Sequence, residues 1–502
     1  MSLSDFVSWF QSHNGVVDTT AIEIVDLPAS EGYRGAVALK DIPEGHTVFS
    51  IPRTLVLSTR TSQLPNRFGE VPWRGFGLHE GWSGLMLCMM WEAALGAQSK
   101  WGPYFDIMPS TFDTPMFWND IDLAELQGTS VVEKLGREQA NKDYNEKVIP
   151  AMQSRPDLFN QEDISTRYSL ETFHIMGSRI LSRSFTLEKT DDAAEKDAHD
   201  DDVGNTSIGS AMDVDSGQNA SHPHSDDAHA EGEDAHAQEE EGGSDDEEEV
   251  AAEVVMIPYA DILNARYQTE NVKLFYEPDC LRMVSTKPIK AGDQIWNTYG
   301  DLPNSELLRG FGHVDYLLLA TGGRGNPGDV AELRADLIVQ SLGNVSQADM
   351  EARIDWWLEE GGEDVFVLEL PASREAVELP PDLLAFTRLI SVDEDWARAQ
   401  RKSTPPKPKA DAATLHILHD ALGKRLALYP TTLAEDEALE AAMDALSLNQ
   451  RHALIVRMGE KRVLELVRAR VAELLAAADK GDNKSKRKAE SGPENGRKKR
   501  KE

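Results

Sequence analysis

The order of apolar and polar positions predicts short strands and tight turns near the start of the chain. Apolar residues in segment 3–10 recur at the spacing of one helical face, so an amphipathic helix is expected first. Brief extended runs follow at 22–25, 36–39 and 47–51. Ile42-Pro43-Glu44-Gly45 is expected to join the last two runs as a hairpin turn. Segment 287–295 repeats this strand-turn-strand pattern, so we expect small sheets that a long insert divides.

Helical patterns fill most of the remaining chain. The region of about 80–187 is predicted to be mostly helical. Beyond Gly322 the apolar positions again follow helical spacing and form two stripes. The stripes consist of Leu415, Leu418, Leu422 and Leu426, and of Leu464, Val467, Val471 and Leu474. This pattern predicts a second folded unit that is all helical.

The segment of about 188–253 differs in composition from both regions. It holds 24 acidic residues and two lysines, a net charge of −22 within a total of −36. It has almost no aromatic or large aliphatic side chains, so it cannot bury enough surface to offset the entropy cost of ordering. We therefore expect a disordered acidic loop that leaves the first domain and returns to it.

The end of the chain carries the opposite charge. Nine basic residues lie between 484 and 501, in clusters at 486–488 and 497–501. This arrangement is typical of a bipartite signal that a nuclear import receptor reads, although the same charges would serve an RNA-binding arm. The net charge of −36 argues against direct nucleic-acid binding. We expect the nucleus as the location, with the cytosol as the alternative.

Length and composition set the class and the domain boundaries. Two cysteines are too few for a disulfide framework or a four-thiolate zinc site, so no metal and a reducing compartment are expected. No apolar run is long enough to cross a bilayer, and the first residues lack a secretion pattern. The expected fold is α+β: a domain at 1–320 with small sheets, helical insert and acidic loop, an all-α domain at 325–480, and a disordered basic tail at 481–502.

Candidate chemistry concentrates between residues 257 and 315. The apolar run Ile257-Pro258-Tyr259-Ala260-Asp261-Ile262-Leu263 ends in Asn264, and a strand and a turn then lead to Asn297-Thr298-Tyr299-Gly300. These stretches together resemble the C-terminal half of the SET-domain lysine methyltransferases. Further similar stretches, such as Pro103-Tyr104-Phe105 and segment 451–459, extend the resemblance over almost the whole chain. The resemblance is most specific to the branch that carries a C-terminal helical domain like that of the Rubisco large-subunit methyltransferase. It implies that the all-α domain at 325–480 is a substrate-binding domain.

The resemblance implies transfer of a methyl group from S-adenosyl-L-methionine to a protein lysine. Such a transfer needs in-line alignment, a neutral amine and exclusion of water, and no metal. By the resemblance Tyr299 is the catalytic hydroxyl that orients the amine and also a cofactor contact, Asn264 contacts the cofactor, and Ala265 contacts the adenine through its backbone. The family usually has histidine where this chain has Ala265, so any hydrogen bond from that ring is lost and cofactor affinity is put in question.

Two earlier segments resemble cofactor contacts of the family. Gly32-Tyr33-Arg34-Gly35-Ala36 is similar to its glycine loop, where small residues let the backbone approach the ligand. Arg34, Gly35 and Ala36 are therefore expected to bind the cofactor, and a plain turn between strands is the other interpretation. Arg183 stands where relatives contact the cofactor, and a guanidinium suits the methionine carboxylate. The alternative for Arg183 is a solvated arginine at a helix end.

Two aromatic residues are expected on the substrate side. Trp82 matches a substrate-side aromatic of the branch, and Phe311 stands where relatives often have a tyrosine that lines the lysine channel. A phenyl ring at Phe311 removes one hydroxyl, so the degree of methylation stays open. His313 is a possible base, but a lone histidine is more often a packed or surface residue.

The branch implies a basic protein substrate, namely a lysine of a large-subunit ribosomal protein. The acidic loop would then raise the rate of encounter with such proteins. One alternative keeps the enzyme and makes the substrate a histone or another nuclear protein. A second alternative is a non-catalytic adaptor or acidic chaperone for basic proteins, which the missing histidine at Ala265 would favour.

Overall fold

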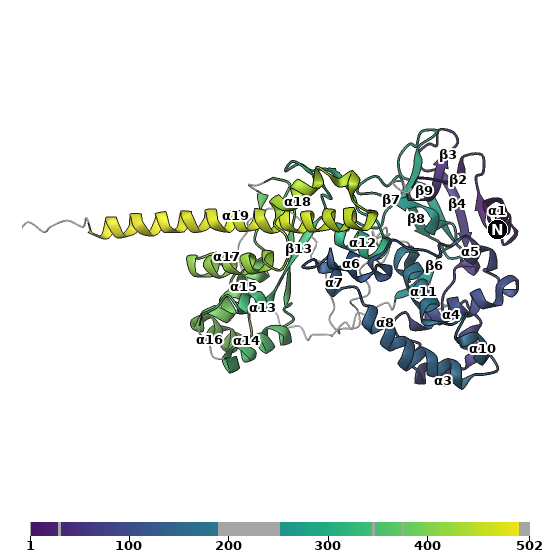
Figure 1. The fold of residues 1–502 in the computed structure, drawn as a ribbon, viewed down its shortest axis with the longest axis horizontal. Coiled ribbons are helices and arrows are strands. Elements are labelled where there is room, and N and C mark those ends of the chain that lie inside the picture. The colour runs from purple at the N-terminus through teal and green to yellow at the C-terminus, as the bar shows by residue number, and fades with distance from the viewer. Residues whose placement is uncertain (1, 29–31, 189–251, 344–346, 374–375, 491–502) are drawn as a thin grey trace, which may run out of the picture. The chain divides into compact units, whose positions relative to one another are not determined.

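The computed structural model describes residues 2–28, 32–188, 252–343, 347–373 and 376–490 (Figure 1). The described chain forms two compact units: Met1–Thr111 with Gly136–Gly300, and Phe112–Leu135 with Asp301–Glu502. Segments 112–135 and 301–320, which the sequence placed in the first domain, pack with the second unit. The acidic loop lies outside the described residues, apart from its two ends.

Two four-stranded sheets form the framework of the first unit (Figure 1). One has the order β1 (Val16–Val17), β4 (Thr47–Pro52), β9 (Cys280–Ser285) and β8 (Val272–Tyr276). The other has the order β2 (Ile22–Asp26), β3 (Arg34–Ala38), β10 (Gln294–Asn297) and β7 (Asn264–Ala265). Each sheet joins strands from before and after the insert, as the sequence predicted. In the second of these sheets, β10 and β7 run parallel to each other.

The two expected hairpins are wrong, although their strands exist. β3 and β4 belong to different sheets, and so do β9 and β10. The turn segments instead pair with each other: the Ile42 N–H donates to the Ile289 carbonyl at 2.8 Å, and the Ile289 N–H donates to the Ile42 carbonyl at 2.9 Å. Because this bridge satisfies their backbone groups, each segment carries the chain from one sheet to the other instead of folding back.

Short helices enclose these sheets. The N-terminal helix α1 (Leu3–Ser12) begins at a capping box, in which Ser2 and Asp5 each bind the other's backbone N–H. The expected helical insert contains α2 (Leu64–Phe68), α3 (Glu70–Gly75), α4 (Ser83–Leu95), α5 (Gly102–Ile107), α8 (Arg137–Asp143), α9 (Ile149–Ser154), α10 (Gln161–Ile164) and α11 (Leu170–Arg183). α4 is buried on nearly all sides, and its Glu92 accepts hydrogen bonds from the hydroxyls of Ser62 and Ser99.

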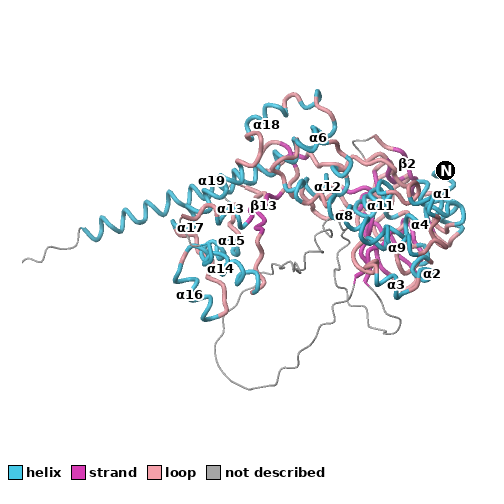
Figure 2. The backbone as a smooth tube through the Cα atoms, turned by 60° about the horizontal axis from the view of Figure 1, so that its bottom comes forward, coloured by secondary structure: helices cyan, strands magenta, loops and turns pink. Residues whose placement is uncertain are grey.

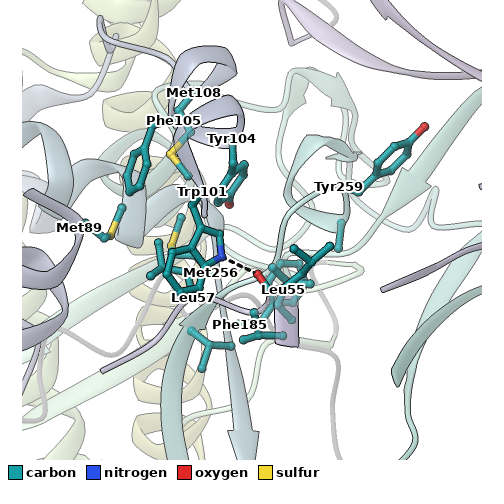
Figure 3. Close-up of a cluster of buried hydrophobic side chains, with 14 of the residues drawn as sticks. Leu55, Leu57, Met89, Trp101, Tyr104, Phe105, Met108, Phe185, Met256 and Tyr259 are labelled. Carbon is teal, nitrogen blue, oxygen red and sulfur yellow. Dashed lines mark hydrogen bonds between the residues drawn. The ribbon is translucent and has the colours of Figure 1, made fainter. Parts of the chain in front are cut away.

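An aromatic corner fixes α5 in the core of the first unit (Figure 3). The indole N–H of Trp101 donates to the Leu55 carbonyl at 2.8 Å, and Tyr104 is fully buried beside it. The next pair of strands, β5 (Ser184–Glu188) and β6 (Ala252–Met256), is antiparallel and carries the acidic loop between its ends. α11 leads directly into β5, so the helix end and this strand pair hold Arg183 in the core region.

The second unit is mainly helical. It contains α6 (Asp120–Ala124), α7 (Ser130–Glu133), α12 (Asn304–Phe311), α13 (Ala335–Val339), α14 (Gln347–Glu359), α15 (Pro381–Ser391), α16 (Asp393–Lys402), α17 (Ala412–Leu426), α18 (Leu433–Glu440) and α19 (Leu448–Glu490). It also contains two small antiparallel ladders, β11 (Leu317–Leu318) with β12 (Arg324–Gly325) and β13 (Val330–Arg334) with β14 (Val365–Glu369). The α+β class and the helical C-terminal unit are confirmed, and these ladders are additional to the all-helical prediction.

The two leucine-rich stripes face each other where α17 packs along α19, with β13 beside them (Figure 2). Leu415, Leu418 and Leu422 are buried against Leu464, Val467 and Val471. α19 continues to Glu490, beyond the point at which the sequence predicted a disordered tail. The lysines, Arg487, Ala489 and Glu490 there favour a helix, whereas Gly481, Asp482, Asn483 and Ser485 do not, so helix propensity alone does not explain the continuation. Residues 491–502 lie outside the described residues.

Candidate active site

Parallel pairing of β7 with β10 brings the two candidate motifs together. Asn264 is opposite Trp296, and Ala265 is opposite Asn297. Tyr299 follows β10 by two residues, and its hydroxyl donates to the Leu263 carbonyl at 3.1 Å. The tyrosine hydroxyl is therefore anchored to the backbone directly before Asn264. The structure places these sequence-predicted residues side by side.

The glycine loop closes over the Asn264 side chain. Gly32 has a φ of +94° and Tyr33 a φ of +62°, so the chain turns through the left-handed region here. A Cβ atom at Gly32 would lie 2.6 Å from the Asn264 amide, and one at Gly35 would lie 2.7 Å from Gln294 Oε1. Both glycines are thus required by close approach. The spacing of Gly32 and Gly35 suits this contact.

The Asn264 amide has a fixed orientation. Its Nδ2 donates to the Arg34 carbonyl at 2.8 Å and to Gln294 Oε1 at 2.7 Å. Because an amide nitrogen has two N–H donors, these two acceptors determine which way the group faces. Sequence reasoning missed Gln294. The available signal was a glutamine inside a strand whose neighbours Ile295 and Trp296 are apolar.

Arg34 and Ala36 contribute through the backbone. The Arg34 guanidinium pairs with Asp26 at 3.2 Å and donates to the Ile107 carbonyl at 2.9 Å, so its side chain holds the edge of the sheet. Ala36 is buried opposite Ile295. The Arg34 carbonyl is the atom of this strand that meets Asn264.

Arg183, Asp261 and Tyr104 form a charged cluster next to the segment that ends in Asn264. Arg183, the last residue of α11, donates from Nη1 to the Asp261 carbonyl at 2.6 Å and lies 3.6 Å from Asp261 Oδ2. The Tyr104 hydroxyl donates to the same Oδ2 at 2.8 Å. Burial raises the pKa of Asp261 to about 6, although Arg183 acts in the opposite direction. The signal for Asp261 was a charged residue inside an apolar run.

Tyr299 is a hydroxyl donor at neutral pH. Burial raises its pKa to about 12, and the charges of Arg183 and Asp261 act on it in opposite directions. A phenol with this pKa keeps its proton, so it can orient a partner by hydrogen bonding but does not supply a ready base. This chemistry suits a reaction controlled by alignment.

The remaining candidate residues belong to other elements of the two units. Trp82 is half-buried directly before α4 and packs against the core of the first unit. Phe311 ends α12 in the second unit, and its ring centroid is 6.2 Å from that of His313. Ala265 offers only a methyl group and its backbone. The roles of Trp82, Phe311 and His313 stay predictions.

Two features of this region suit a zwitterionic, adenosyl-bearing cofactor. Gly32 and Gly35 let the loop backbone pack directly against Asn264 and Gln294, where Cβ atoms would collide with these side chains. Within the described part of the chain, Arg183 Nε is a buried donor without a hydrogen-bond partner, as an arginine awaiting an anion would be. An open depression of about 540 Å³ adjoins this loop through Gln294, and in it the Arg266 guanidinium lies 4.8 Å from the Trp296 ring centroid.

Neither a metal site nor a membrane span is found in the described chain. No group of three or more histidine, cysteine, aspartate or glutamate side chains among the described residues could hold a metal ion. No described helix is both long and apolar enough to cross a membrane.

Comparison with known proteins gives two family matches and several relatives. The SET domain matches residues 33–300, and the Rubisco LSMT substrate-binding domain matches residues 345–464. Ribosomal lysine N-methyltransferase 4 of Saccharomyces cerevisiae is 28% identical over 77% of this chain and 71% of its own. Human N-lysine methyltransferase SETD6 is 27% identical over 86% of this chain and 83% of its own. A solved structure of Rubisco LSMT bound to AdoMet has the same fold, with a TM-score of 0.63, 18% identity and coverage of 99% and 98% of the two chains.

Proposed function

The chain belongs to the SET-domain family of protein lysine methyltransferases, and from this premise we propose that its substrate is a lysine of a large-subunit ribosomal protein. The enzyme uses S-adenosylmethionine as methyl donor. The non-catalytic adaptor interpretation is therefore set aside. The observation that carries the ribosomal substrate is the similarity to the yeast ribosomal lysine methyltransferase over 77% of the chain.

We propose that each element of the site binds one part of the cofactor. Arg34 and Gln294 hold the Asn264 amide, whose Oδ1 would accept a hydrogen bond from the ammonium of the methionine moiety. The 34–36 backbone would line the cofactor site, the Ala265 backbone would contact the adenine, and Arg183 would pair with the carboxylate. When bound, the cofactor supplies a methyl group on a positively charged sulfur.

Tyr299 would then orient the lysine amine. A lysine has an ordinary pKa of about 10.4 and must lose its proton before its lone pair can attack. The Tyr299 hydroxyl donates to the Leu263 carbonyl, so its oxygen lone pairs are directed by that bond. A hydroxyl oxygen and nearby carbonyls can hold an amine in line with the reacting bond, which lowers the entropy cost of alignment. Trp82 and Phe311 are proposed to contact the substrate.

The substrate is tested by methylation of purified particles. The protein is incubated with tritiated S-adenosylmethionine and either large ribosomal subunits or histone octamers, and labelled lysines are located by mass spectrometry. Label on one large-subunit protein, absent with the Tyr299→Phe variant, is expected. Label on histones alone would overturn the ribosomal assignment.

A histone or other nuclear-protein lysine is the second candidate substrate. Human N-lysine methyltransferase SETD6, whose name specifies a lysine but no ribosomal substrate, matches 86% of this chain, whereas the yeast relative matches 77%. This similarity leaves room for a substrate that is not ribosomal. The histone arm of the same assay decides between the two.

Nuclear import is proposed for the basic clusters at 486–488 and 497–501, whose side chains lie outside the described residues. Replacing both clusters with alanine is expected to shift a fluorescent fusion from nucleus to cytosol and to remove binding to an import receptor in a pull-down. An unchanged nuclear signal would exclude this role. The acidic loop is proposed to attract basic substrates, so its deletion should lower the association rate most at low salt.

A further inference from the structure

We infer that the buried carboxylate of Asp261 is a positioning residue, which holds Arg183 in the orientation that engages the carboxylate of the cofactor. The inference rests on the proposed role of Arg183 and adds the group that orients its guanidinium. Asp261 itself would not touch the cofactor.

Asp261 contacts the guanidinium with both its backbone and its side chain. Arg183 Nη1 lies 2.6 Å from the Asp261 carbonyl oxygen and 3.6 Å from Oδ2. The Asp261 side chain is 1% exposed, whereas that of Arg183 is 28% exposed. The carboxylate therefore holds the guanidinium from the protein interior and leaves part of it accessible to a ligand.

A hydroxyl from a distant segment holds the carboxylate. Tyr104, which is fully buried in α5, donates to Asp261 Oδ2 at 2.8 Å across 157 positions of sequence. The aromatic corner around Trp101 fixes α5 in the core. The chain of support thus runs from the core to Tyr104, then to Asp261 and finally to Arg183.

Burial of the Asp261 carboxylate costs folding free energy. Within the described chain, Asp261 Oδ1 is buried without a hydrogen-bond partner. An unsatisfied buried oxygen costs about 1–3 kcal/mol, and replacing buried ion pairs with apolar residues is often neutral or stabilising. A purely structural role would favour an apolar residue at position 261. The negative charge is useful if it controls Arg183.

The groups that act on Asp261 come from three segments: Tyr104 of α5, Arg183 of α11, and Tyr299 after β10. Arg179 of α11 acts on Tyr104. Burial raises the pKa values of Tyr104 and Tyr299 away from neutrality, and it lowers the pKa of Arg179 to about 10. Burial raises the pKa of Asp261 to about 6, so its carboxyl group changes charge between pH 5 and pH 8.

Two ligands that differ in the amino-acid group test the inference. S-adenosylhomocysteine carries the carboxylate, and 5′-methylthioadenosine has the same adenosine and thioether without it. Calorimetric titration at pH 8 is expected to show about tenfold weaker S-adenosylhomocysteine binding by Asp261→Asn, the size of a lost charge-assisted interaction. Binding of 5′-methylthioadenosine should change by less than about twofold.

Three further measurements separate positioning from folding. Tyr104→Phe keeps both charges and should weaken S-adenosylhomocysteine binding by about threefold, which provides a second variant if Asp261→Asn does not fold. Glu92→Gln, a buried carboxylate with hydroxyl partners in the same unit, should leave the ratio of the two affinities unchanged. For wild type, the affinity for S-adenosylhomocysteine divided by that for 5′-methylthioadenosine should fall when the pH is lowered from 8 to 5. For Asp261→Asn this ratio should stay constant.

Equal weakening of both ligands in Asp261→Asn would mean a structural role and would overturn the inference. Unchanged or tighter S-adenosylhomocysteine binding would overturn it too, because the carboxylate would then not orient Arg183 or would compete with the cofactor. If the wild-type protein bound neither ligand, the proposed cofactor site would fail and this inference with it. If wild type bound both ligands and the variants kept the same ratio of the two affinities, the inference would be overturned and the proposed cofactor site would stand.

Discussion

Gln294 should control cofactor affinity although it does not belong to the motif that the sequence resembles. Its Oε1 accepts one of the two N–H groups of Asn264 at 2.7 Å, and the Arg34 carbonyl accepts the other at 2.8 Å. Gln294→Met keeps the length of the side chain and removes the acceptor. The Asn264 amide then loses one of the two bonds that set its orientation.

The expected loss follows from one hydrogen bond. An intramolecular hydrogen bond contributes about 1 kcal/mol net, and an unsatisfied donor costs about 1–3 kcal/mol. If the Asn264 amide reversed, its NH2 group would face the cofactor ammonium, which is also a hydrogen-bond donor, and no hydrogen bond could form. We therefore expect a loss of about 1–2 kcal/mol in cofactor binding, which is about 5- to 30-fold in Kd. Gln294→Glu keeps an oxygen acceptor and should stay within about threefold of wild type.

The assay is calorimetric titration with S-adenosylhomocysteine, with thermal unfolding measured in parallel. Gln139→Met is the matched control, because Gln139 makes one side-chain bond to Asp143 on the exposed face of α8. It should leave Kd unchanged. Wild-type affinity in Gln294→Met, or equal weakening in Gln294→Met and Gln294→Glu, would refute the argument from amide orientation.

Four other variants test separate parts of the account. Tyr299→Phe should lower kcat by about 100-fold or more with cofactor Kd nearly unchanged, whereas Asn264→Ala should raise Kd itself; turnover and calorimetry distinguish them. The folded-state pKa of Asp261 is raised to about 6, so its charge costs stability as pH rises from about 4 through 6. The Tm of Asp261→Asn minus the Tm of wild type should therefore be larger at pH 8 than at pH 4. Arg425→Met leaves Glu460 buried without its ion pair and should cost about 3–5 kcal/mol in urea unfolding.

Different outcomes would contradict each of these. Equal loss of turnover and binding in the Tyr299 and Asn264 variants would mean that their roles are misassigned. A pH-independent Tm difference for Asp261→Asn would exclude its titration near pH 6. For Arg425→Met the control is Arg334→Met, which breaks an exposed pair with Glu133 and should cost less than about 1 kcal/mol; equal costs would contradict the argument from burial.

The sequence predicted the elements of the fold better than their partners. Apolar spacing identified α1, the strands and the two stripes of α17 and α19, because a buried face imposes its period on the chain. The hairpins were wrong because turn residues indicate where a chain changes direction and not which strand it meets. The bridge between Ile42 and Ile289 joins segments far apart in sequence, and neither segment alone encodes it.

Asn264 and Tyr299 were proposed because their motifs resemble those of the SET family. The structure brings the two motifs together on paired strands, and the roles of both residues stay predictions. Gln294 and Asp261 were missed because their partners come from remote segments: Gln294 supports Asn264 from a strand 30 positions away, and Asp261 meets Tyr104 across 157 positions. Such supporting contacts depend on tertiary packing, which local patterning does not contain.

Titration of the purified protein with S-adenosylhomocysteine tests the central claim most directly. The account predicts saturable binding by wild type, at least about tenfold weaker binding by Asn264→Ala, and nearly wild-type binding by Tyr299→Phe. Absence of binding by the folded wild-type protein would contradict the cofactor site. Equal affinity in wild type and Asn264→Ala would contradict its placement at the loop of Gly32 and Gly35.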